Sequence, residues 1–336
     1  MNDGFYLGIV LAGSISAIIS MIFCLTLIII YIISFIQIKS KNNKANKKDS
    51  CKDSFIEKNS IQDSNSVTAK SDTNSNNIGL GSNFMLIIAI SNFIEEFFEF
   101  LFYFYYKDNW NKLEGFVCTL FGLFHNFFGL FSICWVSMLT YLFYCSTNIT
   151  NQIFYQNNKY LLIGFLYSLT ISLIFGVGPL LSNSYGNAET VCSFKYITNE
   201  EGSEKFFIYF WSFSNIVIIL ANNIFNLVCL IKASIYYGKK LKILKKQNMK
   251  EYKMILVYVW VFRIFPIVLL LTGLIKGASR IVTEIYHNDE DTETPTIKLI
   301  LGYTDAIISN LNGFFNSLAC FYFFRGVFTC CQSKSN

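Results

Sequence analysis

Seven apolar stretches divide this chain, and each is long enough to cross the roughly 30 Å hydrocarbon core of a membrane as a helix. The first is the plainest, because no charged residue occurs from Phe5 to Ile38. Hydrophobic residues make up 53% of the chain and charged residues only 15%, against about 25% in soluble domains. The pattern predicts an all-α integral membrane protein with seven transmembrane helices, at residues 5–38, 84–106, 116–144, 160–182, 206–237, 252–278 and 297–324.

The lysines and arginines between these stretches predict the orientation of the bundle, because positive charge is retained on the cytoplasmic side. If the N-terminus lies outside, the cytoplasmic segments hold 18 of these residues and the outer loops hold 7. Asp3 precedes the first stretch and a lysine run follows it, which is the reverse of a signal peptide. We therefore expect the N-terminus outside and the C-terminus in the cytoplasm. Cleavage of the first stretch, which would leave six spans, is the alternative.

The composition divides the chain into four parts. Residues 1–39 form the first helix with a very short outer N-terminus, and residues 84–324 hold helices two to seven. Residues 40–83 are rich in Asn, Ser and Lys and contain no long apolar run, so we expect a disordered cytoplasmic loop. Residues 325–336 are a short cytoplasmic tail. The net charge of +5 is too small to indicate a nucleic-acid partner.

Two cysteines fall on the predicted outer face. Cys118 opens the third stretch and Cys192 lies in the second outer loop, where the oxidising environment preserves disulfides. We expect a bridge between them, with two free thiols as the alternative. Cys330 and Cys331 follow the seventh stretch near the cytoplasmic surface and are candidates for palmitoylation, although two unmodified cysteines are an equal reading.

Ionisable residues inside the spans are candidates for function, because they are costly in lipid and face the bundle interior. In the second stretch, Glu95 and Glu99 share one helical stripe. Arg263 lies in the sixth stretch and Asp305 in the seventh, so an ion pair between Arg263 and a carboxylate is expected. These residues would line a polar cavity that binds ligand, or would only neutralise one another. Pro266 predicts a kink in the sixth helix.

The sequence disfavours several enzyme and pump classes. A zinc hydrolase needs several metal ligands, yet the chain has only two histidines, and His125 in the third stretch is more often a hydrogen-bonding residue than a ligand. A retinal pump needs a lysine in the last span, and none occurs from Leu299 to Phe324. No internal repeat of the kind found in transporters is visible. We therefore expect no catalytic activity, no metal and no cofactor.

The chain from about residue 84 onward holds a series of short motifs: Gly115-Phe116-Val117-Cys118, Cys134-Trp135, Cys192, Tyr252-Lys253 and Gly313-Phe314-Phe315-Asn316-Ser317. In their order and spacing these motifs resemble the cyclic-AMP receptor-like class of G-protein-coupled receptors. The commoner rhodopsin-like receptors look less similar, since the chain lacks an Asp-Arg-Tyr triplet after the third stretch and an Asn-Pro-x-x-Tyr motif in the seventh.

The resemblance implies a plasma-membrane receptor that passes an extracellular signal, with cyclic AMP as the implied ligand, to a heterotrimeric G protein. The basic run at the end of the fifth stretch is then the expected coupling surface, and a topology signal that touches anionic lipid is its other reading. Two alternatives stay open: an ion or proton channel or transporter that uses the intramembrane charges, and a receptor-like protein that acts through partners. The candidate coupling residues are Lys239, Lys240, Lys242, Lys245 and Lys246.

Overall fold

The computed structural model describes residues 3–56, 80–106, 115–148, 158–187, 192–195 and 202–247, with part of the residues between 249 and 321. Its long helices are α1 (Asp3–Ile56), α2 (Leu80–Tyr106), α3 (Phe116–Asn148), α4 (Asn158–Ser172) and α6 (Gly202–Gln247). The π-helical turn η3 (Leu173–Val177) and the short α5 (Gly178–Leu181) continue α4, and β1 (Tyr185–Asn187) pairs with β2 (Cys192–Phe194) in an antiparallel hairpin. Helical residues recur at 270–275 and 313–321.

Four of the described helical segments are long and apolar enough to cross a membrane: Leu7–Gln37, Phe116–Cys145, Lys159–Leu181 and Gly202–Gln247. Large apolar side chains such as Ile22 and Phe213 are exposed along them, as expected where a helix faces lipid. The described chain is almost entirely helical, which confirms the predicted class. The count of seven spans and the orientation stay predictions, because much of residues 249–321 lies outside the described part.

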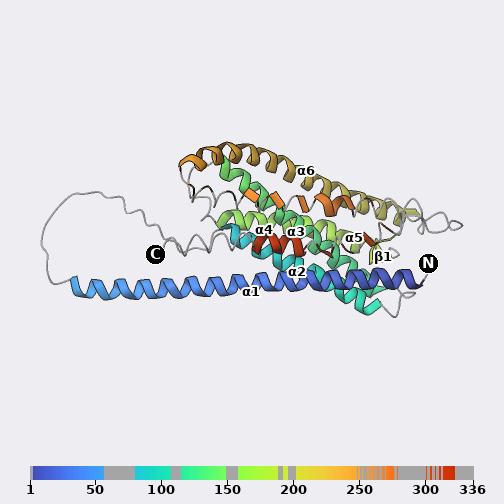
Figure 1. Cartoon of the computed structure of the whole chain (residues 1–336). Helices are drawn as coiled ribbons and strands as arrows, with labels where there is room; N and C mark the ends of the chain where they lie inside the picture. The colour runs from blue at the N-terminus through green and yellow to red at the C-terminus, as the bar shows by residue number, and fades with distance from the viewer. Residues whose placement is uncertain are drawn as a thin grey trace.

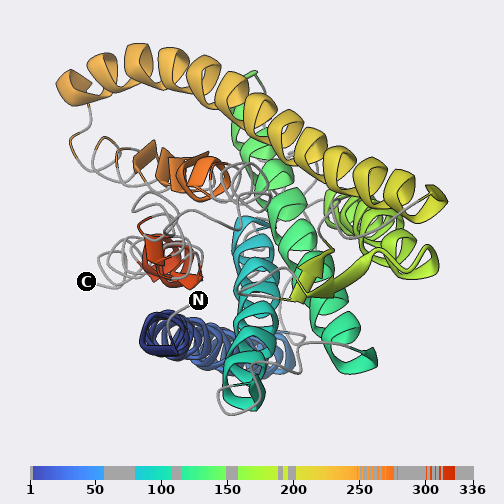
Figure 2. The ribbon, with the colours of Figure 1, turned by 90° about the vertical axis from the view of Figure 1, so that its right-hand side faces the viewer.

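The two ends of the bundle differ (Figure 1). We call the end with β1, β2 and the start of α1 the hairpin end, and the end where α6 reaches Lys239–Lys246 the lysine end. Figure 2 shows α3 passing through the middle of the bundle between α2 and α6. α3 contacts α2, α4, η3, α6 and both strands. Any signal between the hairpin and α6 can therefore run through α3.

The core toward the lysine end is built around Trp135 of α3, which is fully buried. Its ring meets Phe84 of α2 edge to face, with the ring centroids 4.7 Å apart. Gly164 lets α4 approach closely, because a Cβ there would lie 3.1 Å from Trp135. These contacts hold α2, α3 and α4 together.

α1 extends further than the sequence suggested. We expected the first helix to end near residue 39 and a disordered loop to begin at residue 40, but α1 continues to Ile56 and projects beyond the other helices (Figure 1). No glycine or proline occurs between Gly13 and Gly79, so nothing in the polar segment breaks the helix. In the rest of that predicted loop, residues 57–79 lie outside the described part and residues 80–83 belong to the first turn of α2.

Candidate functional site

The hairpin is tied to the bundle by one covalent bond. Cys192 of β2 forms a disulfide with Cys118 in the first turn of α3, with the two Cα atoms 5.2 Å apart. This is the pairing that the sequence predicted. Cys192 also pairs with Asn187 of β1, so both strands are held over the end of α3.

Tyr185 of β1 inserts its ring from the hairpin into the bundle, where it is 1% exposed. The ring stacks on Phe194 of β2 and lies against Gly122 of α3, where a Cβ would approach the ring to 3.0 Å. Burial raises the pKa of the Tyr185 phenol, although a hydrogen bond from Asn126 opposes this. The hydroxyl therefore stays protonated and donates at neutral pH.

Asn126 of α3 is the centre of a polar network at this level. Its Nδ2 donates to the Tyr185 hydroxyl and to the Phe175 carbonyl oxygen, both at 2.8 Å. The Tyr185 hydroxyl donates in turn to the Gly176 carbonyl oxygen at 2.9 Å. Asn215 of α6 donates its Nδ2 to Asn126 Oδ1 at 2.8 Å. We name Asn126, Tyr185, Asn215 and these two carbonyl groups the Asn126 network; it joins α3, η3, the hairpin and α6.

The π-helical turn supplies both carbonyl acceptors of the Asn126 network. Residues 173–177 follow α4 directly, and Gly176 lies so close to α3 that a Cβ would meet Phe127 at 3.1 Å. Single π-helical turns inside longer helices often occur at functional sites. The turn could not be predicted, because apolar periodicity does not distinguish a π-helical turn from an ordinary α-helix.

A second polar contact joins the same helices one level further toward the lysine end. Asn222 of α6 accepts hydrogen bonds at its Oδ1 from Ser137 of α3 at 2.8 Å and from Tyr167 of α4 at 3.2 Å. Asn215 and Asn222 are seven residues apart and so share one face of α6. The sequence analysis did not select these asparagines, although polar residues in apolar spans at helical spacing were the signal that could have identified them.

The predicted stripe on α2 meets His125 of α3. His125 Nδ1 lies 2.6 Å from Glu99 Oε1 and 4.0 Å from Glu95 Oε1. The side chains are only partly exposed, at 28% for His125, 14% for Glu99 and 9% for Glu95. One ligand atom from each of the three residues falls within 4.8 Å of the others. We call Glu95, Glu99 and His125 the acidic cluster; among the described residues they form a compact group of metal-ligand side chains.

Arg263 Nε donates to Ser234 Oγ of α6 at 3.1 Å, and within the described residues no ion pair joins it to Glu95 or Glu99. Its other candidate partner, Asp305, lies outside the described part of the chain. The pairing of Arg263 with a carboxylate therefore stays a prediction.

The remaining predicted residues fall into two groups. The five candidate coupling lysines lie near the end of α6, where they are exposed or half-exposed. Four predicted residues lie outside the described part of the chain: Pro266, Asp305, Cys330 and Cys331.

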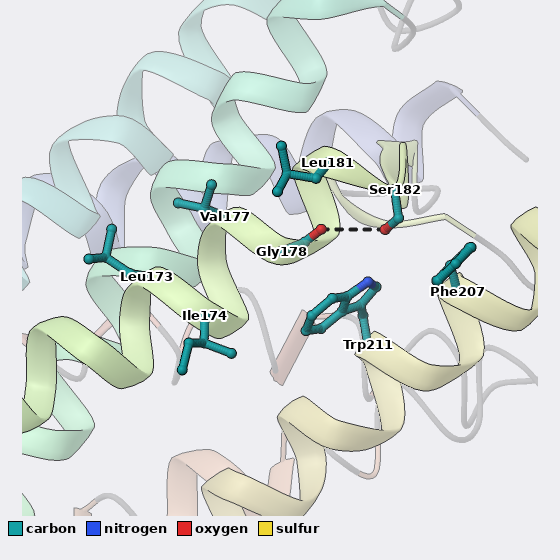
Figure 3. A pocket seen from close by; sticks show the side chains of 8 residues that line it. All are labelled: Leu173, Ile174, Val177, Gly178, Leu181, Ser182, Phe207 and Trp211. Atoms are coloured by element: carbon teal, nitrogen blue, oxygen red, sulfur yellow. Dashed lines mark hydrogen bonds between the residues drawn. The ribbon is translucent and has the colours of Figure 1, made fainter.

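A cavity of about 530 Å³ opens at the hairpin end between η3, α5 and α6. Figure 3 shows Ile174 and Gly178 on one side and Trp211 of α6 on the other. Its lining is mostly apolar; the polar side-chain groups are the indole Nε1 of Trp211 and the Ser182 hydroxyl, which donates to the Gly178 carbonyl oxygen at 3.4 Å. No charged side chain lines it, so the cavity suits an apolar group better than a nucleotide.

Comparison with known proteins identifies the architecture. No family model and no curated protein matches the sequence. Among solved structures, the crystal structure of squid rhodopsin superposes with a TM-score of 0.61 at 15% identity, covering 97% of this chain and 85% of that one. The fold is rhodopsin-like.

The likeness to squid rhodopsin shows the fold, and the four helices that are long and apolar enough to cross a membrane support a membrane protein. The identity is too low to carry more than the fold. The motifs that separate the cyclic-AMP receptor-like class from rhodopsin-like receptors are not tested by this likeness, so that class stays a prediction.

Proposed function

We propose that this protein is a G-protein-coupled receptor of the plasma membrane, not an enzyme, and that it passes an extracellular signal to a heterotrimeric G protein. The observation that carries the proposal is the Asn126 network. It connects a disulfide-anchored hairpin with α6 through α3. The rhodopsin-like fold supports the receptor role. The lysine distribution predicts the orientation, with the hairpin end outside and the lysine end in the cytoplasm.

The signal route follows from the length of α6. This helix is continuous over 46 residues, so a displacement at Asn215 is passed along a rigid element to Lys242, about 40 Å away. Asn222 lies on the way and bonds α6 to α3 and α4 through Ser137 and Tyr167. A ligand that moves the hairpin shifts the population between two packings of α6, provided that it binds one packing more tightly.

Cyclic AMP is the first ligand to test, because the sequence motifs imply it. Its phosphate is anionic, and Glu95 and Glu99 would repel it, so the acidic cluster is not where we place a nucleotide. Thermal unfolding of the purified protein should be measured with cyclic AMP and, in parallel, with cationic amines. A ligand selective for the folded state raises the melting temperature. Absence of any shift with millimolar cyclic AMP would remove this ligand but not the receptor role.

Coupling is tested by nucleotide exchange on heterotrimeric G proteins with the receptor in nanodiscs. The double variant Lys242→Glu/Lys245→Glu should lower exchange several-fold, because it reverses charge on the exposed lysine end. Lys205→Glu is the matched control, since Lys205 is an exposed lysine at the opposite end of the same helix. Equal exchange by both variants, or no acceleration by the wild type over empty nanodiscs, would contradict the proposed coupling.

The acidic cluster favours one other function, a proton or cation path through the bundle. Two carboxylates and an imidazole within 4.8 Å are groups that a proton relay uses. Glu99→Gln should then abolish proton flux in liposomes without ligand. Flux that is absent from the wild type would exclude this alternative.

A further inference from the structure

We propose that Glu95, Glu99 and His125 form a binding site for a divalent zinc ion between α2 and α3. The proposal goes beyond receptor function and does not depend on G-protein coupling. It rests on the geometry of three side chains, on the backbone that holds them, and on the chemistry of their ligand atoms.

The three ligand atoms have the spacing that a zinc ion requires. Zinc bonds of about 2.1 Å in tetrahedral geometry place ligand atoms about 3.4 Å apart. His125 Nδ1 lies 2.6 Å from Glu99 Oε1 and 4.0 Å from Glu95 Oε1, and all three atoms fall within 4.8 Å. These separations lie on both sides of the required value, so small side-chain rotations bring the set to it.

The spacing of residues along both helices places the three ligand side chains next to one another. Glu95 and Glu99 are four residues apart and face α3 from one side of α2. His125 and Gly129 are likewise four residues apart on α3. A Cβ at Gly129 would lie 2.9 Å from Glu95 Oε1, so the glycine makes the space that the carboxylate occupies. Glu95 is thereby held beside His125 by the shape of α3.

The charges of the site favour a cation. Two carboxylates this close repel each other where the surroundings are of low dielectric constant, and a divalent ion between them replaces repulsion with attraction. Packing does not seal the site, since 28% of the His125 side chain is exposed.

The ligand set suits zinc and disfavours calcium and magnesium. Imidazole suits zinc, copper and nickel, whereas calcium and magnesium prefer oxygen ligands alone. Three protein ligands leave a fourth position for water. Because the ligands come from two helices, the bound ion would clamp α2 to α3.

The test is zinc binding by the full-length protein in detergent. After treatment with a chelator and then titration with zinc chloride, we expect one bound zinc per protein by mass spectrometry of the metal and a higher melting temperature. His125→Ala and Glu99→Gln should each weaken binding more than about tenfold, since even residues that only support a metal ligand have effects of 10–100-fold. His287→Ala is the matched control, because it removes the other histidine of the chain, and it should bind as the wild type does.

A second variant keeps the proposal testable if His125→Ala does not fold. His125→Cys supplies a thiolate in place of imidazole, so cobalt bound to this variant should show a sulfur-to-metal charge-transfer absorption that the wild type lacks. That band would place the ion beside residue 125. A wild type that binds no zinc, folded His125→Ala and Glu99→Gln variants that bind it unchanged, or a cobalt-loaded His125→Cys without the band would overturn the proposal.

Discussion

Replacing Tyr185 with phenylalanine isolates the hydrogen bonds of the Asn126 network from its packing. The hydroxyl accepts from Asn126 Nδ2 at 2.8 Å and donates to the Gly176 carbonyl oxygen at 2.9 Å. The phenylalanine ring keeps the stacking on Phe194, with ring centroids 5.3 Å apart, and the contact with Gly122. Any change in the free energy of unfolding therefore reports the two hydrogen bonds.

The expected magnitude follows from the number and burial of these bonds. A buried hydrogen bond contributes about 0.5–1.5 kcal/mol, so the loss of two gives about 1–3 kcal/mol. Hydrogen bonds between helices of a membrane protein average only about 0.6 kcal/mol, which places the expected loss in the lower half of that range, near 1–2 kcal/mol. Tyr185→Phe should be less stable than the wild type, because the substitution leaves a buried amide hydrogen of Asn126 without its acceptor.

Equilibrium unfolding of the purified protein in mixed micelles, titrated with denaturing detergent, measures this free energy. Tyr209→Phe removes the same atom from a tyrosine that is 59% exposed on α6, and it should change stability by less than about 0.5 kcal/mol. A double-mutant cycle of Tyr185→Phe with Asn126→Ala should give a coupling energy of about 0.5–2 kcal/mol. Equal stability of the two tyrosine variants, or no coupling in the cycle, would refute the network as the link between hairpin and bundle.

Three further substitutions test the fold around the site. Cys118→Ser should lower the free energy of unfolding by about 2–5 kcal/mol. A reducing agent should lower the melting temperature of the wild type and leave that of this variant unchanged. Gly176→Ala should destabilise by about 1–3 kcal/mol, because its Cβ would lie 3.1 Å from Cβ and 3.2 Å from the backbone Cα of Phe127 in α3. Gly238→Ala, with nothing within 4 Å, should instead stabilise α6 by up to about 1 kcal/mol, and the same sign for both glycines would contradict the close approach. Trp135→Ala should lower the free energy of unfolding by about 3–5 kcal/mol, because Trp135 is fully buried. Trp260 is exposed, so Trp260→Ala should change it little. Similar losses for the two variants would contradict a core built around Trp135.

The sequence predicted those parts of the fold that local chemistry decides. Charge-free runs identify spans because lipid accepts little else, and the helices found at residues 116–148 and 202–247 contain the stretches expected at 116–144 and 206–237. Cys118 and Cys192 could be paired because the other cysteines fall inside spans or on the cytoplasmic side. The inward stripe with Glu95 and Glu99 followed from helical spacing alone.

The partners of these residues could not be predicted, because they depend on which helices are neighbours. Glu99 meets His125 because α3 lies against its face of α2. Tyr185 lies in a loop where no periodicity constrains its side chain, so its insertion beside Asn126 depends on the hairpin register. The predicted end of the first helix was wrong for a different reason. The polar composition after residue 39 was taken to indicate disorder, although this segment holds no glycine or proline that would end the helix.

His125 and Asn126 are consecutive residues of α3, and they serve two different sites. Successive side chains on a helix point about 100° apart, so one faces the glutamates of α2 while the other faces the hairpin and α6. A rotation of α3 about its own axis therefore moves both side chains relative to their partners at once. The contact of His125 with α2 and the contact of Asn126 with the hairpin and α6 are coupled through this one helix, so a change at either contact is felt at the other.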